Sequence, residues 1–257
     1  VTIVPDYTLP EPDPEVREAG RETVLAPQVN GKQVSAPQPD EQGIFTIETE
    51  GSEDAFTAGI PAEVWSQWLS ARPNAKLHFK TPLGTLTLPL REISLAYFAG
   101  ELGVDEKELS VNVTVRKVSK ELTDVIRRTL SGEGALLYGD PIDFAVEVAA
   151  MGKPSAEVKQ YSRFVRRSIN IPQHLPDKAT ALRYDETAGA VSPVPSWVER
   201  QDGETAVHFL RKGDGIYLIA ARNKSFDDLI RHRLREDVET LSFKWIVRGM
   251  TETEFAP

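Results

Sequence analysis

Apolar and polar residues alternate with a period of two over much of the chain after residue 43. Such alternation is typical of β-strands that bury one face. In the first part of the chain it predicts strands at 44–48, 76–80, 85–90 and 110–118. Turn residues at 81–84 favour a hairpin between the second and third of these strands. Apolar residues spaced three and four apart predict three helices. One begins at Pro61, and the other two cover 93–102 and 120–130.

From residue 142 the pattern becomes almost wholly that of short strands separated by turns. The predicted strands are 142–148, 157–165, 168–171, 179–184, 191–198, 205–210 and 215–221. Many short strands at such regular intervals are typical of an antiparallel sandwich. We therefore expect a mainly β fold, in which a β-rich α+β unit is followed by an antiparallel β-sandwich and a short C-terminal helical segment.

Proline is dense before residue 40, which forbids a long helix but permits edge strands. The apolar pieces Val1–Val4 and Thr23–Ala26 are candidates for such strands, and Asn30-Gly31 predicts a tight turn. We expect five segments along the chain. These are a Pro-rich linker with edge strands (1–40), an α+β domain (41–119), a helical connector (120–140), a sandwich (141–224) and a helical segment (225–257).

Composition narrows the classes of function. The net charge of -9 argues against a nucleic-acid binder, which needs a basic face. The chain has no cysteine, which excludes disulfides and thiolate metal sites. It also has no run of eighteen apolar residues that would predict a membrane span. Because Val1 does not open a signal peptide, we interpret the sequence as a mature or excised fragment.

No group of residues in the sequence is a clear candidate for a catalytic site. The adjacent acids, such as Asp227-Asp228, are typical of helix starts or solvated turns rather than of a paired acid and base. We therefore expect no enzyme activity and no cofactor. Bound calcium stays open, because the turns at Asp202–Glu204 and Asp185–Thr187 carry carboxylates, although their spacing matches no EF-hand loop.

Three tryptophans are candidates for a sugar-stacking platform. Trp65 and Trp68 lie three residues apart on one helix face, which is more commonly buried. Trp197 follows Pro193-Val194-Pro195 and is the better candidate for exposure. These residues support an alternative function, that of a carbohydrate-binding module for cell-wall or extracellular polysaccharide.

The C-terminal segment carries the most specific motif. A Phe-x-Asp-Leu-x-x-His turn opens it, an amphipathic stretch follows, and an apolar pair, a glycine and a Phe-x-Pro loop close it. This order resembles the first half of an S-layer homology (SLH) repeat. The motif positions are Phe226, Asp228, Leu229, His232, Gly249, Phe255 and Pro257.

The resemblance implies a secreted protein in the cell wall or S-layer of a Gram-positive bacterium. Its implied partners are downstream SLH repeats, through them secondary cell-wall polysaccharide, and copies of itself packed laterally. The stretches 76–90 and 181–221 also look like the paired β-domains found upstream of SLH repeats. The second stretch is similar to bacterial relatives of the ZU5 and UPA sandwich pair, some of which cleave themselves at a His-Phe-Ser step. Here that step reads His208-Phe209-Leu210 and lacks the nucleophile.

This sequence departs from the family pattern in the part that binds polysaccharide. Arg233 stands where the family has tryptophan, and the sequence ends before the second family motif. We therefore expect this chain alone not to grip the wall and to serve as a non-catalytic spacer beside an anchor. Leu234, Val238, Leu241 and Trp245 are predicted to form one helical stripe that needs a covering neighbour.

Overall fold

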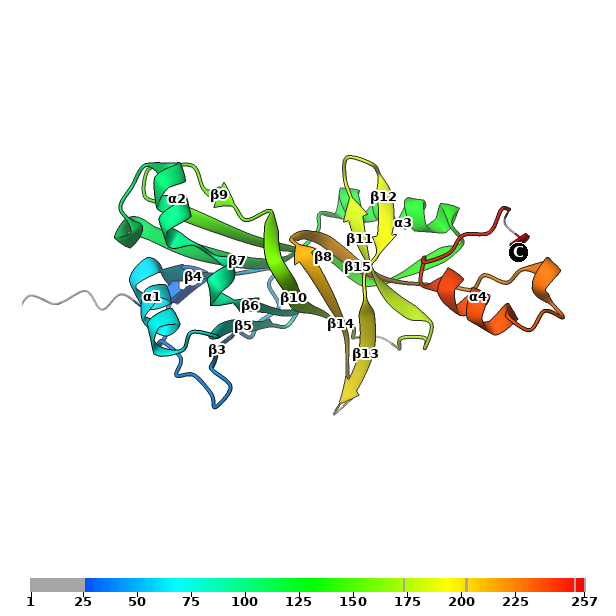
Figure 1. The fold of residues 1–257 in the computed structure, drawn as a ribbon, viewed down its shortest axis with the longest axis horizontal. Helices are drawn as coiled ribbons and strands as arrows, with labels where there is room; N and C mark the ends of the chain where they lie inside the picture. The colour runs from blue at the N-terminus through cyan, green and yellow to red at the C-terminus, as the bar shows by residue number, and fades with distance from the viewer. Residues whose placement is uncertain (1–25, 173, 202, 252, 257) are drawn as a thin grey trace, which may run out of the picture.

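The computed structural model describes residues 26–256 apart from 173, 202 and 252. The described chain is mainly β, as predicted, and its two sheets pack in the manner of a sandwich. Figure 1 shows an elongated molecule in which a helical C-terminal unit projects from one end of the β body. The apolar piece 1–4, nearly all of the piece 23–26, Asp202 and Pro257 lie outside the described residues.

The larger sheet has nine strands. Their order is β12-β11-β15-β8-β7-β4-β1-β2, and β9 also pairs with β8. Their bounds are β1 Gln28–Val29, β2 Lys32–Gln33, β4 Ala55–Pro61, β7 Leu109–Lys117, β8 Ala135–Ala150, β9 Ala156–Glu157, β11 Ala179–Asp185, β12 Ala190–Pro193 and β15 Gly215–Arg222. The predicted turn is confirmed, because Asn30 and Gly31 adopt φ angles of 48° and 76° and join the edge strands β1 and β2.

The smaller sheet has six strands in the order β13-β14-β10-β6-β5-β3. Their bounds are β3 Ile44–Glu48, β5 Lys76–Thr81, β6 Gly84–Pro89, β10 Gln160–Asn170, β13 Ser196–Gln201 and β14 Glu204–Gly213. The predicted β5–β6 hairpin is confirmed. All its pairs are antiparallel except β3 with β5, which pair in parallel because β4 and a helix carry the chain back between them.

The predicted division into two β domains does not match a division between sheets. Strands from 41–119 and from 141–224 occur in both sheets, and one buried core runs through both ranges. The expected boundary at residue 140 falls inside β8, which begins at Ala135, so the connector is shorter than predicted. The first half of β8 pairs with β15 and its second half with β7. Gly139, with φ of 69°, lies where the register between β8 and β15 shifts.

Rings from both sheets meet in the core. Phe144 of β8 lies 6.0 Å from Phe209 of β14 and 6.0 Å from Tyr217 of β15, measured between ring centroids. Phe209 and Tyr217 lie 4.7 Å apart. Burial of each such side chain contributes about 2 kcal/mol to folding. This aromatic cluster holds the two sheets face to face.

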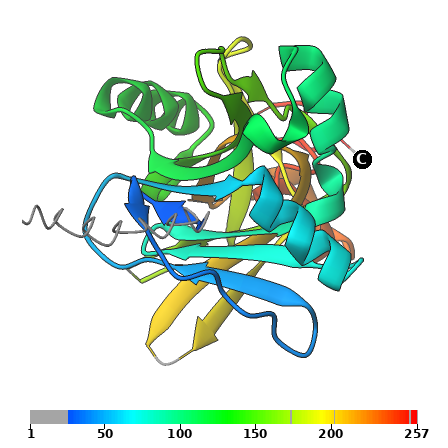
Figure 2. The ribbon, with the colours of Figure 1, turned by 90° about the vertical axis from the view of Figure 1, so that its left-hand side faces the viewer.

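Four α-helices and three short 3-10 helices complete the described chain. The bounds are α1 Ala62–Ala71, α2 Leu95–Leu102, α3 Lys120–Gly132, α4 Arg235–Phe243, η1 Leu90–Glu92, η2 Glu106–Glu108 and η3 Asp227–Leu229. Pro61 ends β4 and caps α1 rather than opening the helix. Ser119 caps α3 by accepting the N–H of Leu122. Figure 2 shows α1 and α2 together on one side of the sheets and α3 apart from them.

Helix α3 covers the outer face of the larger sheet near β15. Ile126 and Leu130 of α3 pack with Leu182, Leu218 and Ala220 in a second buried cluster. Strand β15 therefore buries both faces, since Tyr217 and Ile219 point into the main core while Leu218 and Ala220 point to α3. Continuous burial of this kind explains why β15 reads as an unbroken apolar run.

Candidate functional site

The motif residues of the C-terminal segment gather in one small cluster, the SLH-like unit (residues 225–256). Phe226 and Leu229 are fully buried there with Val238, and Val247 and Phe255 pack against them. The rings of Phe226 and Phe255 lie 5.4 Å apart. The first and last parts of the motif therefore meet in space.

The carboxylate of Asp228 ties these two parts together. It accepts the backbone N–H of Phe255 at 3.0 Å and that of Ala256 at 2.7 Å. These two donors hold the pKa of Asp228 below its ordinary value. A backbone hydrogen bond from Asp227 to the carbonyl of Thr253, 2.8 Å long, supports the same closure.

Gly249 is required by space. A Cβ at this position would lie 2.3 Å from Cε1 of Phe226 and 2.6 Å from the carbonyl oxygen of Glu254. Both distances are far shorter than a van der Waals contact. The glycine of the motif therefore lets the chain pass directly over the buried Phe226 ring.

His232 has a local role in the turn after η3. Its N–H donates to the carbonyl of Leu229 at 2.9 Å, and its Nδ1 accepts the N–H of Leu234 at 3.3 Å. His232 and Arg233 are exposed. The structure thus brings Phe226, Asp228, Leu229, Gly249 and Phe255 together, whereas His232 lies at the surface and Pro257 outside the described residues.

The predicted apolar stripe is split. Leu234 and Leu241 are exposed, and Val238 faces the SLH-like cluster. Trp245 packs instead on the β body, in the cluster that α3 covers. The prediction was wrong at Trp245 because α4 ends at Phe243 and Trp245 adopts φ of 60°, which no longer follows helical periodicity.

A cluster that we name the Arg222 joint connects the SLH-like unit to the body. Arg222, at the end of β15, donates from Nε to the carbonyl of Ser242 at 2.9 Å and lies 3.4 Å from the carboxylate of Glu133. Its guanidinium carbon sits 4.2 Å from the centroid of the Trp245 ring. The indole N–H of Trp245 donates to Glu133. Glu133, Arg222, Ser242 and Trp245 make up this joint.

The joint unites the ends of three elements, α3, β15 and α4. Arg222 and Trp245 are both buried, whereas Glu133 is partly exposed, so the joint combines a buried cation with a carboxylate that solvent can reach. Sequence inspection missed the joint because its members are far apart in the chain, and Glu133 lies between two glycines that read as an ordinary turn. An arginine at the end of an apolar strand was the one available signal.

The candidate sugar platforms differ in exposure. Trp65 is fully buried, and Trp68 is buried with its ring stacked 4.5 Å from that of Phe45. Neither tryptophan can offer a ring face to a ligand, since α1 turns both toward the sheets. Trp197 is 41% exposed on the edge strand β13 and stacks on His208, at 5.4 Å and 19°. His208 itself alternates with the buried Val207 and Phe209 along β14, as expected.

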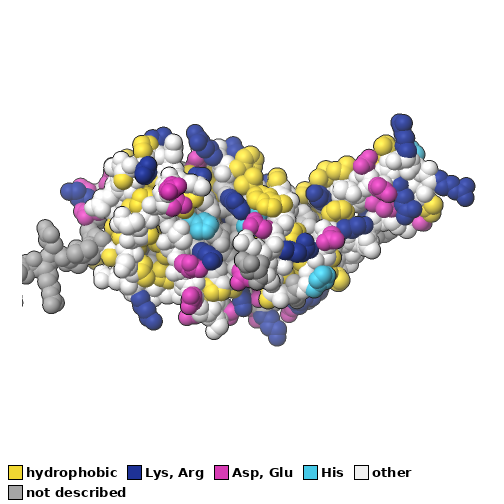
Figure 3. Space-filling view, turned by 90° about the horizontal axis from the view of Figure 1, so that it is seen from below, with side chains coloured by type: hydrophobic (Ala, Val, Ile, Leu, Met, Phe, Trp, Pro, Cys, Tyr) yellow, Lys and Arg dark blue, Asp and Glu magenta, His cyan; other side chains and the backbone are white. Residues whose placement is uncertain are grey.

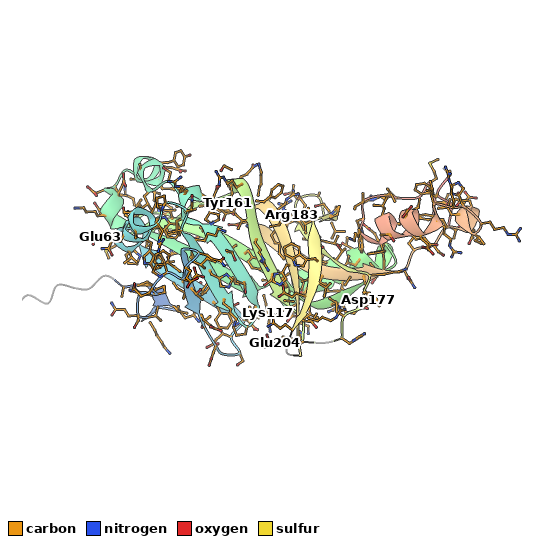
Figure 4. All side chains as sticks on the ribbon, turned by 60° about the horizontal axis from the view of Figure 1, so that its bottom comes forward. Glu63, Lys117, Tyr161, Asp177, Arg183 and Glu204 are labelled. Atoms are coloured by element: carbon orange, nitrogen blue, oxygen red, sulfur yellow. The ribbon has the colours of Figure 1, made fainter. Side chains whose placement is uncertain are left out.

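A buried polar network lies between the sheets. Arg167 forms an ion pair with Asp214, which also accepts the hydroxyl of Tyr161 at 2.6 Å. Figure 4 labels Tyr161 on β10. Burial raises the pKa of Asp214, and the charge of Arg167 offsets part of that rise. Rings of Phe144, Tyr161 and Tyr217 surround the guanidinium of Arg167 at 5.5 to 5.9 Å, so this network is part of the core.

A hollow of about 680 Å³ opens between Lys117 and Glu204, which Figure 4 labels. Its lysine is already paired, because Lys117 binds Asp54 at 2.9 Å and Asp140 at 3.4 Å. These carboxylates raise the pKa of Lys117. We assign no ligand to this hollow.

The calcium candidates do not converge. Asp185 uses one carboxylate oxygen to accept the N–H groups of Thr187 at 3.0 Å and Ala188 at 3.1 Å, which closes its own turn. Asp202 lies outside the described residues. Among the residues that the structure does describe, no three histidine or acidic side chains are grouped as a metal site.

Every helix of the described chain is too short or too polar to traverse a bilayer. Comparison of the sequence with protein-family models and with curated proteins finds no match.

Proposed function

We propose that the chain is a non-catalytic architectural segment of a secreted cell-surface protein, in which a rigid β body holds an SLH-like unit in a fixed orientation. The Arg222 joint carries this proposal. Neighbouring folded units normally move relative to each other unless a well-packed contact joins them. Here a buried arginine, a carboxylate and a tryptophan ring lock the unit to the body.

The closure of the SLH-like unit supports the same role. Five motif positions have a structural role in this closure: Phe226, Leu229 and Phe255 pack together, Asp228 holds the last loop, and Gly249 passes over the Phe226 ring. Five of the seven motif positions thus have a packing or capping role, which supports the resemblance. Such a unit is suited to continue into further SLH repeats.

The proposed setting follows from that resemblance. The protein would be located outside the cell, in the wall or S-layer of a Gram-positive bacterium. Its partners would be SLH repeats, secondary cell-wall polysaccharide bound through them, and neighbouring copies in the layer. A chain without cysteine suits an exported protein that folds without disulfide-forming machinery.

Rigidity can be measured directly because the chain has no native cysteine. Spin labels on Met151→Cys and Ile230→Cys place one probe on the body and one on the SLH-like unit, both at exposed positions. Pulsed electron paramagnetic resonance should give one narrow distance distribution. The double variant Glu133→Gln, Trp245→Ala should broaden this distance distribution, because it weakens both contacts of the Arg222 guanidinium.

The control is Arg116→Met, which breaks an exposed ion pair with Asp143 on the body and should leave the distance distribution narrow. A broad distribution in the unmodified chain contradicts the architectural role.

Antibodies against the chain should label intact cells of the source bacterium, and labelling only after lysis contradicts the surface location. Release of soluble fragments from cell walls by the purified chain contradicts the absence of catalysis.

A further inference from the structure

Trp197 is 41% exposed on β13, the edge strand of the smaller sheet. His208 and Arg166 both approach the indole, at 5.4 Å and 5.3 Å from its centroid. They belong to β14 and β10, which both lie on the inner side of β13 in the sheet. The exposed part of Trp197 therefore faces away from these neighbours, past the open edge.

The ring is held in place before any ligand arrives. His208 donates toward Glu199, with Nε2 3.0 Å from the carboxylate, and its Nδ1 lies 3.2 Å from Arg166. Burial and the charge of Arg166 lower the pKa of His208, which favours a neutral ring that accepts at Nδ1 and donates at Nε2. A side chain fixed in this way loses little conformational entropy on binding.

A hydrogen-bond donor and a hydrogen-bond acceptor lie beside the Trp197 ring. The side chains of Arg166 and Glu199 lie 3.8 Å apart and are 48% and 47% exposed, so each keeps hydrogen-bonding capacity toward solvent. Arg166 and His208 also line a hollow of about 500 Å³, together with His78, Lys80, Thr85 and Thr87. Figure 3 views the molecule from below and shows positive and negative side chains interspersed over the surface of the β body.

This arrangement selects a class of ligand. An anion would meet the carboxylate of Glu199, and a purely apolar ligand would cover the half-exposed charges of Arg166 and Glu199 without offering them a hydrogen bond. A sugar ring has one face of C–H groups, which can lie on an indole, and hydroxyls that both donate and accept. We propose that Trp197, Arg166 and Glu199 form a saccharide-binding site on the outer face of the smaller sheet. This site goes beyond the architectural role and does not depend on the SLH-like unit.

Fluorine NMR can test the site, because all four tryptophans are among the described residues and only Trp197 is exposed. The chain is labelled with 5-fluorotryptophan and titrated with cellotetraose, chitotetraose and mannotetraose up to about 20 mM, the range of weak binding. At least one of these saccharides should shift the Trp197 resonance, which Trp197→Phe identifies. The resonances of Trp65, Trp68 and Trp245 should stay in place and report that the fold is intact.

Variants distinguish a specific binding site from nonspecific stacking of sugars on an exposed indole ring. Binding in the variants is measured by saturation-transfer NMR observed on the saccharide. Trp197→Ala should remove binding, and Arg166→Met or Glu199→Gln should weaken it at least about fivefold. Tyr97→Ala is the matched control, since Tyr97 is 65% exposed but lies on α2 away from this sheet. The proposal is overturned if no saccharide shifts the Trp197 resonance, if the three buried tryptophans shift equally, or if both polar variants bind as well as the unmodified chain.

Discussion

The carboxylate of Asp228 accepts the backbone N–H of Phe255, so the first turn of the SLH-like unit holds its last loop. The two residues are adjacent in space because Phe226 and Phe255 share one small apolar cluster. A single side chain thus closes a unit that has few buried residues of its own. Its protonation state should control whether that unit stays closed.

Acid should therefore open the SLH-like unit before the body. The pKa of Asp228 is lower in the folded chain than its ordinary value, so its contribution to stability is complete above about pH 4 and is lost as pH falls through the folded pKa. Amide NMR signals of Phe255 and Ala256 should change in that window. Asp228→Asn should abolish this pH dependence.

Asp227→Asn is the matched control for this change. It leaves in place the backbone N–H of residue 227 that binds Thr253. The pH profile of the Phe255 amide should be the same in this variant as in the unmodified chain. An identical profile in Asp228→Asn would show that the carboxylate does not close the unit.

Gly249→Ala should destabilise the SLH-like unit by about 1–3 kcal/mol, because the added methyl group overlaps the Phe226 ring and a backbone carbonyl. Hydrogen exchange should speed up in residues 225–256 and stay unchanged in β8. Gly100→Ala is the control, since it lies in α2 with nothing within 4 Å of the added carbon, and it should stabilise α2 by about 0.5–1 kcal/mol. Equal protection of the unit in both variants contradicts the steric role of Gly249.

Trp245→Leu should loosen the SLH-like unit without unfolding the body. Leucine keeps apolar contact but loses the N–H bond to Glu133 and the ring beneath Arg222. Limited proteolysis should then cut between β15 and η3, at residues 223–226, several times faster. Ile246→Ala, at a neighbouring position that is 59% exposed, should leave that rate unchanged. Equal cleavage in both variants means that the joint does not hold the unit.

Asp214→Ala should cost about 3–5 kcal/mol of body stability, because it leaves the buried Arg167 without its carboxylate. The double change Arg167→Met and Asp214→Ala should recover part of that loss, since methionine fills the space between the three rings without a charge. Urea unfolding of the four members of this cycle measures the coupling. Additive effects of the two changes would mean that the pair is not coupled.

Local structure was largely predictable from the sequence. The β5–β6 hairpin, the Asn30-Gly31 turn and the helix at 120–130 appear where periodicity and turn residues indicate them. Strand β4 escaped prediction although Phe56, Ala58 and Ile60 alternate in it and are fully buried. Gly59 and Pro61 break its apolar pattern, and the close approach of Asn112 to Gly59 depends on a neighbouring strand.

Relations between distant residues were not predictable in the same way. Each of the two predicted domains contributes strands to both sheets. This arrangement depends on strand pairs such as β10 with β6, which local periodicity cannot reveal. The Arg222 joint likewise depends on where three separate elements end. The motif positions of the SLH-like unit lie within one short segment, so their spacing is visible in the sequence, and the resemblance to an SLH repeat stays a prediction.

Strand β8 has one further consequence. Strand β8 pairs with β15 along its first half and with β7 along its second half, so one continuous strand links the two parts of the larger sheet. Unfolding of the body should therefore be cooperative, with one transition for residues 44–222 rather than two. That coupling means that force applied to either part of the larger sheet is transmitted to the other part through β8.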